Sequence, residues 1–223
     1  MFQGYSNETF EFFMAIRFNN NRPFFLDNRD WYLRAVREPS LALARELADT
    51  VEAIDPNLER RDHRVVSRIN RDIRFSRDKS PYRDCCWLSF HHTGEDKGKL
   101  PGFYFEVRDS GGYYGMGFYR GNKALMDLIR KRILEKPREM LELWLLLEAD
   151  FHFYGDVASR VSIPESVPPQ LQALYAAKSF YFEREITDFD LIRSPALAQE
   201  LRQGFERLKP LYRRIIDLHM QQG

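Results

Sequence analysis

The spacing of hydrophobic residues predicts helices over the first 54 residues. Ser6 is suited to cap a first helix, in which aromatic residues recur near the helical spacing up to Phe18. Pro23 and Pro39 are suited to open two further helices, because the first helical turn does not need the N–H that proline lacks. The turn-forming sequence Asp55-Pro56-Asn57 then ends this helical region.

The middle of the chain changes to the alternating pattern of strands. Three segments follow one another there: Cys85 to His92, Gly102 to Arg108 and Tyr113 to Tyr119. Successive side chains of a strand point to opposite faces, so each segment gathers its hydrophobic residues on one face. The turn sequence Asp109-Ser110-Gly111-Gly112 joins the last two segments. The pattern predicts an antiparallel meander at about residues 85–119, with one face buried.

Helical patterns resume after the meander. They cover Asn122 to Leu147 and Pro195 to Leu218, with an interruption expected near Pro210, and Phe180 to Ile186 reads as a short strand. We find no internal repeat and no linker long enough to mark a second domain. Helices followed by a meander and more helices predict one α+β domain over residues 1–223. In that domain the meander packs against the N- and C-terminal helices.

Composition narrows the class of protein. Aromatic residues make up 14% of the 223 residues, which excludes wholesale disorder. The formal net charge of +1 excludes a strongly basic coat over the whole surface and disfavours nucleic acid as a partner. A local basic patch is still compatible with this balance.

The cysteines and the lengths of the hydrophobic runs indicate the cellular compartment of the protein. Cys85 and Cys86 are adjacent in sequence, so they cannot join distant segments as a disulfide framework would. This suits a reducing compartment. The most apolar run, Leu141 to Leu147, is far shorter than the roughly 20 residues that span a bilayer. We therefore expect a cytoplasmic protein with no membrane association.

One segment between the helices and the meander is unusually basic. Between Arg60 and Asp84 there are nine Arg and Lys residues against four Asp residues, a local excess of five positive charges. Its centre is the run Arg68-Ile69-Asn70-Arg71-Asp72-Ile73-Arg74-Phe75-Ser76-Arg77-Asp78-Lys79-Ser80-Pro81-Tyr82-Arg83. Arginine presents a planar fork of donors that matches carboxylate or phosphate.

This run resembles the signature of a widespread bacterial and fungal family, domain-of-unknown-function family 2461. The resemblance extends over nearly the whole chain. Further matching stretches are Phe10 to Phe13, Asn19-Asn20, Asp30 to Tyr32, Gly102-Phe103-Tyr104, Gly111-Gly112, Gly115-Met116-Gly117, Lys178-Ser179-Phe180 and Lys209-Pro210-Leu211. The family has no established activity, so the resemblance implies one continuous fold and leaves the function open.

The chemistry of the basic run favours a pocket for a small ligand that bears phosphate or carboxylate. In this hypothesis the cations hold the anion, the two aspartates orient the cations and the tyrosine lines the site, opposite the glycine-rich hairpin. An enzyme of this kind would suit phosphate-ester chemistry. The candidate ligand-binding residues are Arg68, Arg71, Asp72, Arg74, Asp78, Lys79 and Tyr82.

Two other interpretations use the same residues. In the first, the arginines and aspartates form a network that pins a long loop onto the sheet, with no ligand. In the second, the segment is a non-catalytic interaction module that docks an acidic protein partner or nucleic acid, with Phe75 or Tyr82 stacking on bases. A concave, buried segment would favour the pocket, and a convex, exposed segment would favour docking.

We expect no metal and no cofactor. His91-His92 lies close to the two cysteines, but neighbouring strand residues point to opposite faces and no second ligand pair with zinc-like spacing follows. Gly115-Met116-Gly117 followed by Gly121 lacks the last glycine of the dinucleotide fingerprint, at Arg120. These glycines are more readily explained by a bulge or a close backbone approach.

Overall fold

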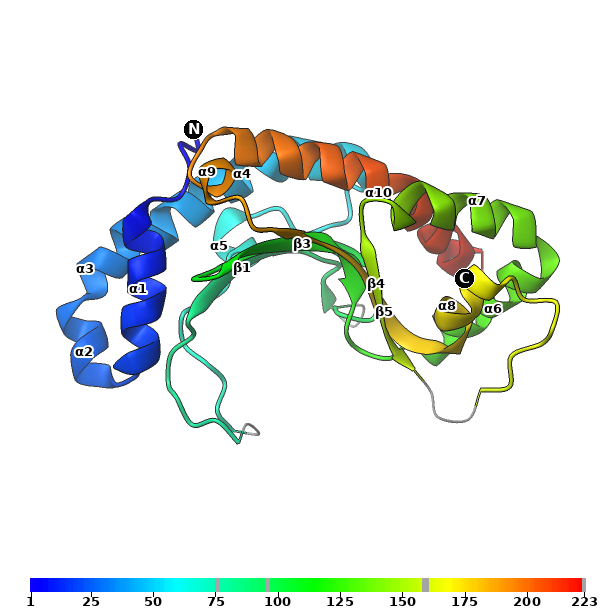
Figure 1. The fold of residues 1–223 in the computed structure, drawn as a ribbon, viewed down its shortest axis with the longest axis horizontal. Coiled ribbons are helices and arrows are strands. Elements are labelled where there is room, and N and C mark those ends of the chain that lie inside the picture. The colour runs from blue at the N-terminus through cyan, green and yellow to red at the C-terminus, as the bar shows by residue number, and fades with distance from the viewer. Residues whose placement is uncertain (75–76, 95–96, 158–160, 222–223) are drawn as a thin grey trace.

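The centre of the molecule is one antiparallel sheet (Figure 1). The computed structural model describes residues 1–74, 77–94, 97–157 and 161–221, and these contain five strands in the order β1-β2-β3-β5-β4. The strands are β1 (Cys85–Phe90), β2 (Gly102–Arg108), β3 (Gly111–Phe118), β4 (His152–Val157) and β5 (Ala177–Ile186). The predicted meander is confirmed as β1, β2 and β3. It is extended by β5, which contains the predicted strand Phe180 to Ile186, and by β4 at the edge.

The predicted N-terminal helices are confirmed, with an almost continuous helical path between the second and the third. Asn21 caps the second helix by accepting a hydrogen bond from the N–H of Phe24, at 3.0 Å. A π-helical turn joins two of the helices without a break. The elements are α1 (Asn7–Phe18), α2 (Arg22–Asp27), α3 (Arg29–Tyr32), the π-helical turn (Leu33–Arg37), α4 (Glu38–Ile54) and the short α5 (Asp62–Val65).

The second half of the chain supplies the remaining helices. The expected interruption near Pro210 is wrong, because the last helix continues through it. Proline removes one intrahelical hydrogen bond, but Leu208 and Leu211 on either side stay buried against the same core. The elements are α6 (Lys123–Glu135), α7 (Pro137–Glu148), a 3-10 turn (Pro169–Leu171), α8 (Gln172–Ala176), α9 (Phe189–Ile192) and α10 (Ala196–Met220).

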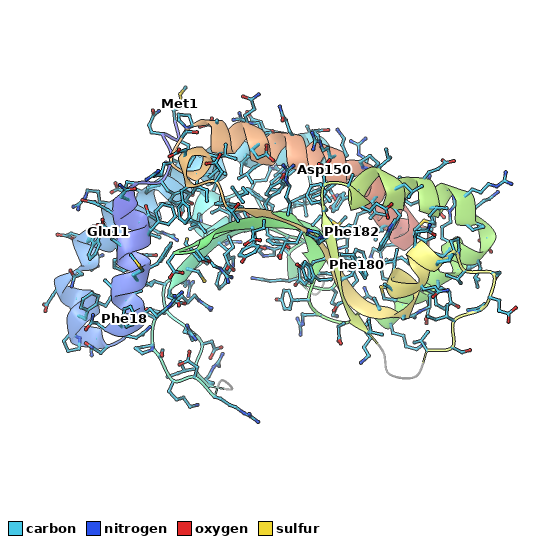
Figure 2. All side chains as sticks on the ribbon, viewed as in Figure 1. Met1, Glu11, Phe18, Asp150, Phe180 and Phe182 are labelled. Atoms are coloured by element: carbon cyan, nitrogen blue, oxygen red, sulfur yellow. The ribbon has the colours of Figure 1, made fainter. Side chains whose placement is uncertain are left out.

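The sheet is curved like an arch, and its two faces differ. Helices α4 and α10 lie across the convex face (Figure 1). There the ring of Phe103 in β2 packs against Phe205 and Tyr212 of α10, at centroid distances of 5.0 and 4.9 Å. Phe180 and Phe182 of β5 lie in the middle of the molecule (Figure 2) and are fully buried. The concave face carries the alternate strand residues and is not covered in this way.

The edge of β1 that faces away from β2 forms hydrogen bonds with the segment that precedes β1. Val66 forms an antiparallel bridge with Leu88, and the N–H of Ser67 donates to the carbonyl of Trp87 at 2.8 Å. The residues that lead into the basic run are therefore attached to the edge of the sheet. No helix in these described ranges combines the length and hydrophobicity needed to cross a bilayer. The cytoplasmic location stays a prediction.

Candidate functional site

The basic run forms a hairpin that projects from the sheet. The N–H of Arg71 donates to the carbonyl of Pro81 at 2.9 Å, and the N–H of Arg83 donates to the carbonyl of Ile69 at 2.8 Å. We call residues 68–83 the arginine hairpin. It extends on the concave side of the arch, below β1 in the view of Figure 1. Phe75 and Ser76 lie outside the described residues.

The base of the arginine hairpin is tied to the N-terminal helices by shared carboxylates. Arg71 pairs with Asp78 of the hairpin and lies 3.6 Å from Asp84. Arg17 of α1 donates from Nε to the same Asp84 at 2.7 Å, and it also binds Asp109 in the turn before β3. Arg71 is therefore already partnered, and its contacts orient the hairpin.

The other candidate charges of the hairpin are satisfied within the hairpin itself. Arg74 donates to Asp72 at 2.9 and 2.7 Å, and this bond lowers the pKa of Asp72 to about 2. Lys79 donates from Nζ to the carbonyl of Ile73 at 2.9 Å. Asp78 accepts the N–H of Ser80 at 2.9 Å, so both aspartates hold local structure. Arg68 lines the groove on the concave face of the sheet, whereas Arg74 and Lys79 are not among its lining residues.

Tyr82 anchors the hairpin to the N-terminal helices. Only 8% of it is exposed, and its ring packs on Phe25 with a centroid distance of 4.4 Å. Its N–H donates to Asn20 Oδ1 at 2.9 Å, and its carbonyl accepts from Asn20 Nδ2 at 3.0 Å. Among the described residues its hydroxyl has no hydrogen-bond partner. No sequence pattern predicts this role of Asn20, because Tyr82 is 62 residues away along the chain.

A groove of about 1090 Å³ lies on the concave face beside the hairpin. Its walls come from the 63–68 segment, the loop after β1 and the outward residues of β1, β2 and β5. It differs from the core in having charged and aromatic side chains together. Its lining residues include Arg68, Trp87, Lys97, Tyr104, Tyr181 and Glu183.

The floor of the groove depends on the glycines of β3. Gly115 lies between Tyr104 of β2 and Glu183 of β5 in the register of the sheet. Because no side chain stands between them, Tyr104 reaches across β3 and donates its hydroxyl to Glu183 at 2.7 Å. Burial, together with the Glu183 carboxylate, raises the pKa of Tyr104 well above its usual value. The tyrosine is thus a neutral donor that fixes Glu183.

The glycines also confirm the predicted close backbone approach. A Cβ placed on Gly115 would overlap the carbonyl oxygen of Phe182 and lie 3.0 Å from Glu183 Cα. The ring of Tyr181 lies over Gly117 and meets Tyr104 at a centroid distance of 5.6 Å, nearly perpendicular at 86°. Packing within the sheet accounts for both glycines.

Trp87 stands at the side of the groove nearest the hairpin. The Arg83 guanidinium lies 4.4 Å from its ring centroid, a cation–π contact. Burial lowers the pKa of Arg83 below its usual value. Sequence reasoning missed Trp87, Tyr104, Tyr181 and Glu183 as site residues. The sequence does contain a signal for them, because these four residues occupy the strand positions that alternate with the buried hydrophobic ones.

The acidic side chains of the groove have hydrogen-bond or ion-pair partners, whereas two of its basic side chains have none within the described ranges. The buried carboxylate of Glu59 accepts from Arg61 at 2.6 and 2.8 Å, which lowers its pKa to about 2. Glu106 pairs with Arg108, and Glu183 is held by its tyrosine. In the part of the chain that the structure describes, the side chains of Arg68 and Lys97 have no hydrogen bond or ion pair. Each of the three carboxylates therefore has at least one partner, whereas the cations of Arg68 and Lys97 have none among the described residues.

The cysteines and histidines do not form a metal centre in the described part of the chain. No three His, Cys, Asp or Glu residues there are placed to hold a metal ion. Burial and the neighbouring carboxylates raise the pKa of Cys85 to about 12. Burial also raises the pKa of Cys86, which packs against the helical layer. Both are therefore thiols, not thiolates, at neutral pH.

Comparison with known proteins agrees with the resemblance seen in the sequence. A search of proteins with assigned functions finds no match. One family model does match, that of the conserved hypothetical proteins designated DUF2461, and it spans residues 8–213. This range includes the arginine hairpin, the whole sheet and most of α10. The chain therefore belongs to the conserved hypothetical protein family DUF2461.

Proposed function

We propose that the protein binds a small anionic ligand in the concave groove, with Arg68 as the principal contact. The observation that carries this proposal is the charge balance of the groove. Its three carboxylates are engaged by Arg61, Arg108 and Tyr104, whereas Arg68 lines the groove with its guanidinium unpaired among the described residues. An unpaired guanidinium beside aromatic walls favours a phosphate or carboxylate ligand.

The other candidate residues take supporting roles in this proposal. Arg71 and Tyr82 fix the hairpin whose first residue is Arg68, so they position the ligand contact without making it. Asp72 and Asp78 hold the hairpin's own turns. The ligand is therefore bound by one end of the basic run, and not by all of its cations at once.

The proposal is tested by a thermal-shift screen of the full chain with phosphorylated metabolites, nucleotides, dicarboxylates and inorganic phosphate. A ligand at about 100 times its Kd adds about 2.7 kcal/mol to the free energy of unfolding, which is easily seen. We expect Arg68→Ala to remove the shift. Arg138→Ala, which changes an exposed arginine on α7, is the matched control and should retain it. Equal shifts in both variants would rule out Arg68 as the contact.

A second candidate function is favoured by the exposure of the hairpin. Its distal part projects from the sheet, and the side chain of Arg74 is 76% exposed. Residues 68–83 hold six basic and two acidic side chains. We propose as the alternative that the hairpin docks an acidic segment of a protein partner. Nucleic acid is the weaker choice, because the whole chain has a formal net charge of only +1 and lacks the basic excess typical of nucleic-acid-binding proteins.

This alternative is tested by fluorescence anisotropy with a labelled polyglutamate peptide and, in parallel, a labelled single-stranded DNA. The double variant Arg74→Ala/Arg77→Ala is expected to bind polyglutamate about fivefold more weakly, since exposed charge pairs contribute up to about 1 kcal/mol together. Arg138→Ala again serves as the control. Tighter binding of DNA than of the peptide, with the same loss in the double variant, would replace the protein partner by nucleic acid.

A further inference from the structure

We infer that the anionic ligand of the groove is an acidic sugar, a hydroxylated ring that carries a phosphate or a carboxylate. This inference rests on the proposed function and goes further by naming the chemical class. It depends on what the groove offers besides the open cations: hydrogen-bond acceptors on the floor, and single aromatic ring faces on the walls.

The floor of the groove is rich in acceptors. A carboxylate has about four lone-pair sites, and among the described residues Glu183 accepts one hydrogen bond, from the hydroxyl of Tyr104 at 2.7 Å. Glu106 lines the same groove from β2, and its partner Arg108 occupies one of its oxygens. Ser89 and Thr93 add hydroxyl groups to the lining. Such a floor matches a ligand with several hydrogen-bond donors, and vicinal hydroxyl groups supply them.

The walls favour a sugar ring over a nucleobase. A base is best held between parallel ring faces, but the close ring pair of the groove, Tyr104 and Tyr181, is perpendicular at 86°. Trp87 has the Arg83 guanidinium over its ring at 4.4 Å, so at most one of its faces is open. A sugar needs only one such face, against which its C–H groups pack.

The cations give the ligand its third requirement, a negative charge. Arg68, before β1, and Lys97, in the segment between β1 and β2, both line the groove. A ring held over the floor by Glu183 can direct a phosphate or carboxylate to Arg68. The two acidic groups differ in geometry, so the probes below include one of each.

The test is isothermal titration calorimetry of the full chain with glucose 6-phosphate, glucuronate, glucose, AMP and inorganic phosphate. The wild type is expected to bind one of the two acidic sugars at least about tenfold more tightly than glucose, AMP or inorganic phosphate. Glu183→Gln keeps an acceptor for Tyr104 but loses the charge, and should weaken acidic-sugar binding about tenfold. Glu185→Gln, on the same strand and face but outside the groove lining, should leave binding unchanged.

The outcomes separate this inference from the function on which it rests. If AMP or inorganic phosphate binds as tightly as the sugars and Arg68→Ala removes that binding, the assignment of the ligand as a sugar is wrong, but anion binding in the groove is supported. If acidic sugars bind but Glu183→Gln and Glu185→Gln behave alike, the assignment of the floor is wrong. If no probe binds but the thermal-shift screen finds another anion that depends on Arg68, only the sugar assignment is wrong. If neither experiment finds a ligand, the proposed function is wrong as well. The order of the probe affinities in the wild type decides the chemical class of the ligand even if the Glu183→Gln variant does not fold.

Discussion

Adding one methyl group at Gly115 is expected to destabilise the protein by about 3 kcal/mol, the upper end of the usual range for overpacking. The new Cβ would overlap the carbonyl oxygen of Phe182 in β5, and backbone cannot move aside as a flexible side chain can. The central pairing of β3 with β5 would have to separate. Strand propensity alone predicts the opposite sign, because glycine weakens a strand interior.

The measurement is urea unfolding of Gly115→Ala beside Gly121→Ala. At Gly121 a Cβ would meet nothing closer than 3.8 Å, so that variant should stay within about 0.5 kcal/mol of the parent. The pair separates the close approach from the general loss of glycine flexibility. An unchanged midpoint for Gly115→Ala would mean that the two strands are not as close as the structure places them.

Truncating Tyr82 to alanine is expected to cost about 3–5 kcal/mol, the usual range for a buried aromatic residue. The ring fills the space against Phe25, and its loss would detach the hairpin from α2. The change is measured by urea unfolding. Limited proteolysis is expected to cut the hairpin faster in Tyr82→Ala than in the parent.

Tyr82→Phe distinguishes an anchor from a ligand contact. The hydroxyl has no hydrogen-bond partner among the described residues, so its removal should change stability by less than about 0.5 kcal/mol. A residue that donates its hydroxyl to the ligand would instead lose binding in this variant with the fold intact. Loss of anion binding in Tyr82→Phe would therefore restore the original hypothesis that Tyr82 lines the site.

The sequence pattern predicted the elements whose burial is one-sided and regular. β2 alternates buried and half-buried residues along its length, as the meander required. β4 was missed because it lies at the sheet edge with almost every residue exposed, so hydrophobic alternation is absent. Pro210 misled the prediction because a local rule for proline was outweighed by the packing of Leu208 and Leu211.

The candidate site was predicted only in part, for a different reason. The charge density of the arginine hairpin is visible in the sequence, but the partners of each charge are not. Arg71 and Arg17 come to share the carboxylate of Asp84 only through the fold. Tyr104 and Glu183 are 79 residues apart in sequence, and their contact depends on a glycine in a third strand. Single-sequence patterns carry no information about such pairings.

The place of β5 in the sheet has a consequence for synthesis. β5 lies between β3 and β4, although both are made before it. A nascent chain that ends before Ala177 leaves the edges of β3 and β4 without each other or a common neighbour, which exposes strands to misassociation. It also lacks the groove residues Tyr181 and Glu183. We therefore expect that no ligand can assist folding on the ribosome, and that binding selects only the finished chain.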